Sequence, residues 1–260
     1  ESFVRNYIIK RILQSILILF CVMFIIYALL RCLPSSFAQT MAIQLSQAPG
    51  AKPYEEWLAQ LNASFGLDMD IVPGFFTWLS KAIVGNFGDS WKWNVSAVAK
   101  FQEVVGLSVI MGGISFVISL LIAVPLGIAC SRSPLLEKVS VGVSGILRII
   151  PSLAVLVVCV PILGTGTLPA VVALTVLAIP PILINTALGF RSVPADVLEA
   201  ARGMGMDECL VFLKIKVPLA FPVSFAGVRT AASEVVASAT LAAYIGAGGL
   251  GQIIFTGISQ

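Results

Sequence analysis

The sequence predicts an all-α, polytopic transmembrane helical bundle, and three observations carry this prediction. Hydrophobic residues make up 58% of the 260-residue chain and charged residues only 11%, whereas a soluble domain carries about 25% charged residues. Apolar runs of the length that crosses a bilayer recur along the chain. No polar stretch between these runs is long enough for a separate soluble enzyme. We therefore expect a membrane protein with five to six transmembrane helices.

The expected spans follow from the length of a bilayer-crossing helix, which needs about 20 apolar residues. Five runs reach this length and a shorter sixth run follows them: 12–33, 104–130, 139–163, 169–190, 218–244 and 250–258. Basic residues precede the first run in the order of a signal peptide, but the run is too long and no small-residue cleavage site follows it. We predict that this run is a retained transmembrane helix.

The region between the first two runs holds all four tryptophans and is expected to be a small helical insertion. Residues 53–68 have the pattern of a short amphipathic helix. Its hydrophobic side consists of Trp57, Leu58 and Leu61. Residues 74–88 are apolar but too short to span, which favours a position at the membrane interface. The expected domains are an N-terminal transmembrane helix, an insertion and a core: 1–33, 34–103 and 104–260.

Lysine and arginine near the ends of the spans predict the orientation, because cytoplasmic loops carry an excess of both. Basic residues cluster in the N-terminal tail, the 131–138 loop and the 191–217 segment: Arg5, Lys10, Arg11, Arg132, Lys138, Arg191, Arg202, Lys214 and Lys216. The short 164–168 turn has none. We expect those three basic regions to face the cytoplasm, and residues 34–103 and the 164–168 turn to face outside.

The residues give no support to catalysis or to a metal or nucleotide site. Histidine is absent, which removes the usual catalytic triads and most zinc sites, and the five cysteines are scattered. The stretch GAGGLG at 246–251 matches G-x-G-x-x-G, but a dinucleotide site requires a strand before it and a helix after it. We interpret it as a glycine-rich turn at the outer end of a helix. The net charge of +3 indicates no nucleic-acid partner.

The polar segment at 191–217 interrupts the apolar pattern and is expected to fold as helix, glycine turn and helix. Ser192 is a candidate cap for the first helix, with Pro194 near its first turn. Gly203 and Gly205 end that helix, and Asp207 is a candidate cap for the second helix. Such a segment offers a rigid surface between two membrane spans.

The small residues Ala200 and Ala201, next to Glu199, leave a shallow surface that another protein can approach closely. Glu199-Ala200-Ala201, three residues, Gly205, nine residues and then Ile215-Lys216-Val217-Pro218 resemble the EAA motif of bacterial ABC importer permeases, with Val217 in place of the usual leucine. This resemblance implies the type I ABC importer (MetI-like) permease fold, in which the segment is a coupling helix that docks on a cytoplasmic ATPase.

The resemblance implies that the ATPase contact is shaped by residues of the motif and of the adjoining turn: Glu199, Ala200, Ala201, Gly203, Gly205 and Asp207. It also implies the partners, which are two ATPase subunits, a second permease subunit that is identical or homologous, and an extracytoplasmic solute-binding protein. ATP and Mg are then bound by the ATPases, and this chain needs no cofactor. The expected location is the bacterial cytoplasmic (inner) membrane, with a cytoplasmic N-terminus.

Two branches of this superfamily are visible in the sequence. IPSLAVL (150–156), EAARGMGM (199–206) and TLAAYIGAGGLG (240–251) resemble permeases for glycine betaine, choline and related osmoprotectants. The first hundred residues resemble the start of dipeptide and oligopeptide permeases, with Pro34-Ser35-Ser36 in place of that family's PGDP. The resemblance favours a betaine- or choline-like solute, with short peptides as the alternative. An ATPase-independent secondary transporter or channel is a competing class, and a non-transporting scaffold is a third.

Ionisable side chains inside predicted spans are costly and usually face a cavity or a partner. The candidates for a translocation pathway are these charges and the polar or proline residues near them: Arg148, Pro151, Ser152, Asn185, Arg229 and Glu234. Arg148 and Glu234 lie at depths that allow them either to line a solute path or to form a buried structural ion pair. For Arg229 a structural role is favoured.

Overall fold

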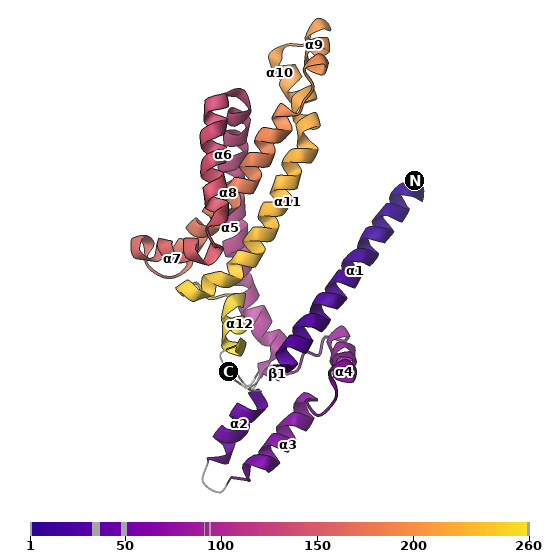
Figure 1. The fold of residues 1–260 in the computed structure, drawn as a ribbon, viewed down its shortest axis with the longest axis vertical. Coiled ribbons are helices and arrows are strands. Elements are labelled where there is room, and N and C mark those ends of the chain that lie inside the picture. The colour runs from indigo at the N-terminus through magenta and orange to yellow at the C-terminus, as the bar shows by residue number, and fades with distance from the viewer. Residues whose placement is uncertain (1, 33–36, 48–50, 91, 94, 259–260) are drawn as a thin grey trace. The chain divides into compact units, whose positions relative to one another are not determined.

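The computed structural model describes residues 2–32, 37–47, 51–90, 92–93 and 95–258, which are almost entirely helical (Figure 1). The Pro34-Ser35-Ser36 stretch lies outside the described residues. The chain divides into two compact units, Glu1–Val98 and Ala99–Ser259.

The first unit contains a long helix, three shorter helices and a two-stranded hairpin: α1 (Ser2–Arg31), α2 (Phe37–Ser46), α3 (Tyr54–Phe65), α4 (Ile71–Ile83), β1 (Asp89–Ser90) and β2 (Val95–Ser96). α2 and α3 pack through a small core in which Leu61 is buried and Trp57 and Leu58 are partly buried. The prediction of an amphipathic helix with these three residues on one side is therefore confirmed.

Aromatic side chains join α1 to α4. Phe75 of α4 is fully buried. The centre of its ring lies 5.4, 5.1 and 5.6 Å from the ring centres of Phe20, Phe24 and Tyr27, respectively. Arg31, at the end of α1, donates hydrogen bonds to the carbonyl oxygens of Gly66, Leu67 and Met69 in the loop before α4. These contacts hold the helices of the first unit together through edge-to-face aromatic packing and through a charged donor on three backbone acceptors.

The second unit holds most of α5 and all later elements: α5 (Ala97–Arg132), α6 (Pro134–Ile149), α7 (Ser152–Leu163), α8 (Thr167–Arg191), α9 (Ala195–Gly203), α10 (Glu208–Leu210), a π-helical segment η1 (Val211–Lys216), α11 (Val217–Leu241), a 3₁₀ turn η2 (Ala242–Ile245) and α12 (Leu250–Ile258). α8 is the central helix, because its residues from Ala178 to Ala187 join one buried core with α5 and α11.

Glycines allow the central helices to approach closely. A Cβ on Gly189 of α8 would lie 2.7 Å from the carbonyl oxygen of Ala220 on α11, and a Cβ on Gly127 of α5 would lie 2.9 Å from the carbonyl oxygen of Leu183. Real Cβ atoms do not occupy such positions, so only glycine permits these helix–helix distances. Small residues at helix contacts are typical of membrane bundles, in which backbone proximity provides the van der Waals attraction.

Among the residues that the structure describes, four helical segments are long and apolar enough to cross a membrane: Arg5–Arg31, Ala97–Arg132, Thr167–Arg191 and Glu208–Ile245. α6 and α7 together make a fifth candidate span, which is bent by 99°. The prediction of a membrane helical bundle is confirmed, with five spans when the bent pair is counted as one. The described part of α12, Leu250–Ile258, has nine residues, compared with the roughly 20 that a span needs.

The expectation of one continuous helix over 139–163 is wrong, because the chain breaks at Ile150 and Pro151. Pro151 has no N–H and restricts the residue before it to extended backbone. Ile150 accordingly has φ −73° and ψ 125°, and α7 begins at the next residue after Pro151. The broken helix turns sharply against α8 and leaves space at its corner.

Candidate functional site

The segment between α8 and α11 extends beyond the end of this helix pair and carries α9 and α10 (Figure 1). α9 begins after Pro194 and ends at Gly203. Gly205 has φ +85°, a left-handed conformation that favours glycine. Asp207 caps the next helix, since its Oδ1 accepts a 2.7 Å hydrogen bond from the N–H of Leu210. The helix–glycine turn–helix prediction and the Asp207 cap are confirmed.

Two details of that prediction are wrong. Ser192 does not cap α9, because its hydroxyl instead donates to the carbonyl oxygen of Gly189 at the end of α8. The second helix is not separate from the next span either, since Glu208–Ile245 runs as one helical segment through η1. Pro218 lies where η1 meets α11, and its missing N–H removes one backbone hydrogen bond of this continuous segment. The polar segment is therefore joined to the membrane span without a flexible loop.

The turn is held by a charged pair as well as by its backbone. Arg202 Nε donates to Glu208 Oε1 over 2.6 Å. The hydrogen bond with Glu208 raises the pKa of Arg202, because it stabilises the charged guanidinium. Backbone N–H groups of Met204 and Gly205 donate to carbonyl oxygens in the last turn of α9. These bonds stabilise the conformation of the exposed turn.

The residues of the EAA-like motif differ in exposure. Glu199, Ala200, Gly203, Gly205 and Asp207 are exposed. Ala201 is only 1% exposed, so the expectation that it forms the outer surface with Ala200 is wrong. α9 packs against η1, and Ala201 is the buried residue of α9 as Val211 is that of η1. Ala201 thus supports α9 from beneath.

Contacts place the basic loops of the second unit at one end of its helices. Arg191, which ends α8, forms an ion pair with Glu137 of α6. Arg132, which ends α5, lies with its guanidinium carbon 5.6 Å from the ring centre of Phe212. The 164–168 turn lies at the opposite end, where the N–H of Gly166 donates to the carbonyl oxygen of Ile245 over 2.9 Å. The basic loops and the uncharged turn are therefore separated as the positive-inside rule requires.

The glycine-rich stretch at 246–251 lies at the same end as the uncharged turn. Gly246, Gly248 and Gly249 all have positive φ, and they reverse the chain between η2 and α12. The N–H of Leu250 donates to Ser108 Oγ over 2.9 Å. A tight glycine turn was expected from the sequence, and it is present.

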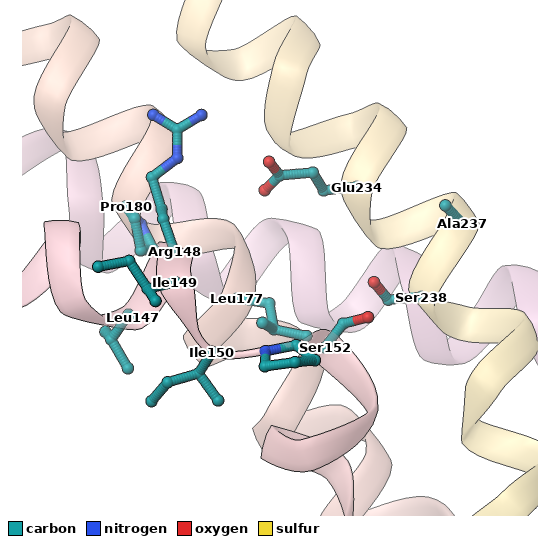
Figure 2. A pocket seen from close by; sticks show the side chains of 11 residues that line it. Leu147, Arg148, Ile149, Ile150, Ser152, Leu177, Pro180, Glu234, Ala237 and Ser238 are labelled. Carbon is teal, nitrogen blue, oxygen red and sulfur yellow. The ribbon is translucent and has the colours of Figure 1, made fainter.

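A pocket of about 400 Å³ lies at the corner of the broken α6–α7 helix (Figure 2). Its lining comes from the corner, from α8 and from α11: Leu147, Arg148, Ile149, Ile150, Pro151, Ser152, Leu177, Pro180, Glu234, Ala237 and Ser238. Four of the six pathway candidates thus come together here: Arg148, Pro151, Ser152 and Glu234. The pocket has the size and mixed lining of a site for a small molecule.

Asn185 and Arg229 do not join this pocket. The side-chain amide of Asn185 donates to the carbonyl oxygen of Pro181 over 2.8 Å, within α8. Arg229 is exposed on α11. Leu177, Pro180 and Ser238 also line the pocket but were not predicted from the sequence. The Pro180-Pro181 pair inside an apolar run could have indicated a special position in this helix, because neither proline can donate a backbone hydrogen bond.

Arg148 and Glu234 face one pocket and do not form an ion pair, which was one of the two alternatives left open by the sequence. The two charges attract each other electrostatically, yet neither has a hydrogen bond or an ion pair with any residue that the structure describes. Figure 2 shows the Glu234 carboxylate directed from α11 toward the side of the pocket where Arg148 projects. The arrangement places one free positive and one free negative group around a common space.

The second unit has the architecture of a transporter subunit, and comparison with known families agrees. The family model described as "Binding-protein-dependent transport system inner membrane component" matches residues 122–260, more than half of the chain. The N-terminal model of such membrane components matches residues 4–94. The chain belongs to this family: it is a multi-pass membrane permease subunit of a type I ABC importer.

Curated relatives of this chain include permeases named for carnitine and choline. The carnitine transport permease protein OpuCB of Listeria monocytogenes is 45% identical over 60% of this chain and 68% of its own. The choline transport system permease protein OpuBB of Bacillus subtilis is 40% identical over 56% and 67%. An inward-facing structure of the MetNI methionine ABC transporter shares the fold, with a TM-score of 0.53 and 26% identity over 60% of this chain and 79% of that chain.

Proposed function

We propose that this permease imports a small quaternary-ammonium solute of the betaine, carnitine or choline kind. The observation that carries the proposal is the similarity of more than half of this chain to permeases named for carnitine, choline and glycine betaine. The N-terminal region matches a model whose description names no peptide. The relatives therefore favour the osmoprotectant class over the peptide alternative.

The exposed face of the polar segment is proposed to dock on a cytoplasmic ATPase. Glu199, Ala200, Gly203, Gly205 and Asp207 supply this face, and Ala201 holds α9 in place from within. Small exposed residues permit close approach, and the hydrogen-bonded turn provides a preorganised surface. ATP and Mg belong to the partner, so the chain itself catalyses no reaction.

The complete importer contains two ATPase subunits, a second permease subunit and an extracytoplasmic binding protein in this proposal. The N-terminus, the 131–138 loop and the polar segment face the cytoplasm of a bacterial inner membrane. Closure of the ATPases displaces the polar segment, and this movement passes directly into α11 because η1 joins the two without a loop. Glu234 lies on α11, so the same movement changes the pocket.

The solute path is proposed to include the pocket residues Arg148, Pro151, Ser152 and Glu234. Asn185 and Arg229 lie outside this pocket. The proposed role of Asn185 is in the packing of α8 against α11, where Gly227 lies next to it. A competing secondary transporter or channel would need no docking surface of this kind. It would also move solute in the absence of ATP.

Uptake by the reconstituted importer tests the function. Proteoliposomes contain the permease, its ATPase and its binding protein, and labelled glycine betaine, carnitine, choline and a dipeptide are offered in turn. We expect ATP-dependent uptake of at least one quaternary-ammonium solute and none of the dipeptide. Uptake of the dipeptide alone would refute the proposed substrate class. Transport by the permease alone, without ATPase, would instead support the secondary transporter or channel.

A further inference from the structure

The pocket at the α6–α7 corner presents two opposite charges from separate elements. Arg148 lies in the last turn of α6 and Glu234 on α11. Glu234 is partly buried, whereas Arg148 is exposed. Both lack a hydrogen bond or ion pair among the described residues, so the donors of the guanidinium and the oxygens of the carboxylate are available. Ionised groups at membrane depth are costly unless a partner or water meets them.

The wall between the two charges adds polar groups of its own. Pro180 and Pro181 have no N–H, so the carbonyl oxygens of Val176 and Leu177 receive no donor from the next helical turn. Leu177 and Pro180 both line the pocket. Ser152 and Ser238 contribute hydroxyl groups to the same lining. The lining therefore includes two serines as well as a residue with a guanidinium and a residue with a carboxylate.

We propose that this pocket is a binding site for a zwitterionic solute, whose carboxylate pairs with Arg148 while its cationic head group faces Glu234. This inference rests on the proposed function and narrows it: the permease itself selects betaine- and carnitine-like zwitterions over a cation such as choline. The pocket volume of about 400 Å³ is within the range of small-molecule sites.

The expected preference for zwitterions over cations follows from which charged side chain of the pocket each solute leaves unpaired. A zwitterion meets both charges, and its carboxylate fits the planar fork of the guanidinium. A cation without a carboxylate satisfies Glu234 but leaves the Arg148 guanidinium without an acceptor. A binding site that pairs a polar group of its solute discriminates against analogues that lack this group. With such an analogue, the protein group is left without its hydrogen-bond partner, which is unfavourable.

Charge-neutralising variants test the site. In the full importer, glycine betaine and choline uptake are measured below saturation for wild type, Arg148→Gln, Arg148→Lys and Glu234→Gln. Loss of one charge-assisted hydrogen bond corresponds to a roughly ten- to one-hundredfold change. We expect Arg148→Gln to lower the betaine-to-choline ratio by about tenfold or more, and Arg148→Lys to retain most of the preference. Glu234→Gln is expected to weaken the uptake of both solutes.

The control is Lys138→Gln, which removes an exposed positive charge from the same helix, α6, outside the pocket lining. Its uptake ratio is expected to equal that of wild type. Equilibrium binding of both solutes to the permease–ATPase complex without binding protein is a second measurement, because the binding protein has a selectivity of its own. The wild-type complex is expected to bind betaine more tightly than choline, and Arg148→Gln to remove this difference.

Two results would overturn the inference while leaving the proposed function intact. In one, the wild-type importer takes up quaternary-ammonium solutes, but Arg148→Gln leaves the betaine-to-choline uptake ratio unchanged. The other is an equal loss of glycine betaine and choline uptake in Arg148→Gln and in Glu234→Gln, with full recovery of uptake in the exchanged variant Arg148→Glu/Glu234→Arg. Such recovery would indicate that the two residues form a structural charge pair. Failure of the wild-type importer to take up any such solute would refute the proposed function instead.

Discussion

Ala200 and Ala201 are neighbours in the sequence but differ in their environment. Consecutive residues of a helix point about 100° apart, and α9 has only one face against η1, so Ala201 is buried while Ala200 is exposed. Local patterns predicted Gly205 and Asp207 correctly, because a left-handed backbone and a helix cap depend on nearby residues. The burial of Ala201 depends on η1, which the local pattern does not place.

Bulky substitution at Ala200 tests the docking face. Ala200→Trp adds a large side chain to an exposed position, so the fold is retained while ATPase contact is blocked. We expect at least about a tenfold loss of ATP-dependent uptake and of co-purified ATPase, which corresponds to about 1.4 kcal/mol or more. The matched control is Ala195→Trp on the same helix, also exposed and about 140° away around the axis. Equal losses in both variants would argue against a specific contact at Ala200.

The contact between α8 and α11 shows why these two helices form the centre of the second unit. Gly227 of α11 lies against Pro181 and Asn185 of α8, where an added Cβ would come within 2.6 Å of Asn185 Cβ. At this contact the carbonyl oxygen of Pro181 accepts a hydrogen bond from the side-chain amide of Asn185. α8 therefore packs closely against α11 and also contributes Leu177 and Pro180 to the lining of the pocket.

Substitution of Gly227 by alanine is expected to force α8 and α11 apart. Overpacking of this kind costs about 1–3 kcal/mol, and the apparent melting temperature of the purified permease in detergent should fall. Gly142→Ala is the control, because a Cβ on this α6 glycine has nothing within 4 Å. Its melting temperature should match or slightly exceed that of wild type. Equal melting temperatures for Gly227→Ala and wild type would contradict the close packing of these helices.

The second unit as a whole separates its charged and uncharged connections. The 131–138 loop and the polar segment meet at one end through the Arg191–Glu137 ion pair, and the 164–168 turn meets η2 at the other. The bilayer favours this arrangement, because the positive-inside rule assigns basic loops to the cytoplasm. The side of the membrane at each end is a prediction that labelling can decide.

Thiol labelling tests the sidedness. Cys209 is exposed in the polar segment, and a variant that keeps only this cysteine should react with a membrane-impermeant maleimide in inside-out vesicles but not in right-side-out vesicles. The control is Thr165→Cys in an otherwise cysteine-free chain, since Thr165 is exposed in the opposite turn. It should show the reverse pattern. Labelling of Cys209 from the outside would invert the proposed topology.

The sequence by itself determined the membrane class, most of the spans, the polar helix–turn–helix and the family resemblance. These features depend on local properties: apolar length, glycine and proline backbone preferences, and the positions of basic residues. Tertiary structure decided that α6 and α7 bend by 99°, that Ala201 is buried and that Arg148 and Glu234 share a pocket without pairing. Each of these outcomes depends on the packing of elements distant in the sequence, which local periodicity does not encode.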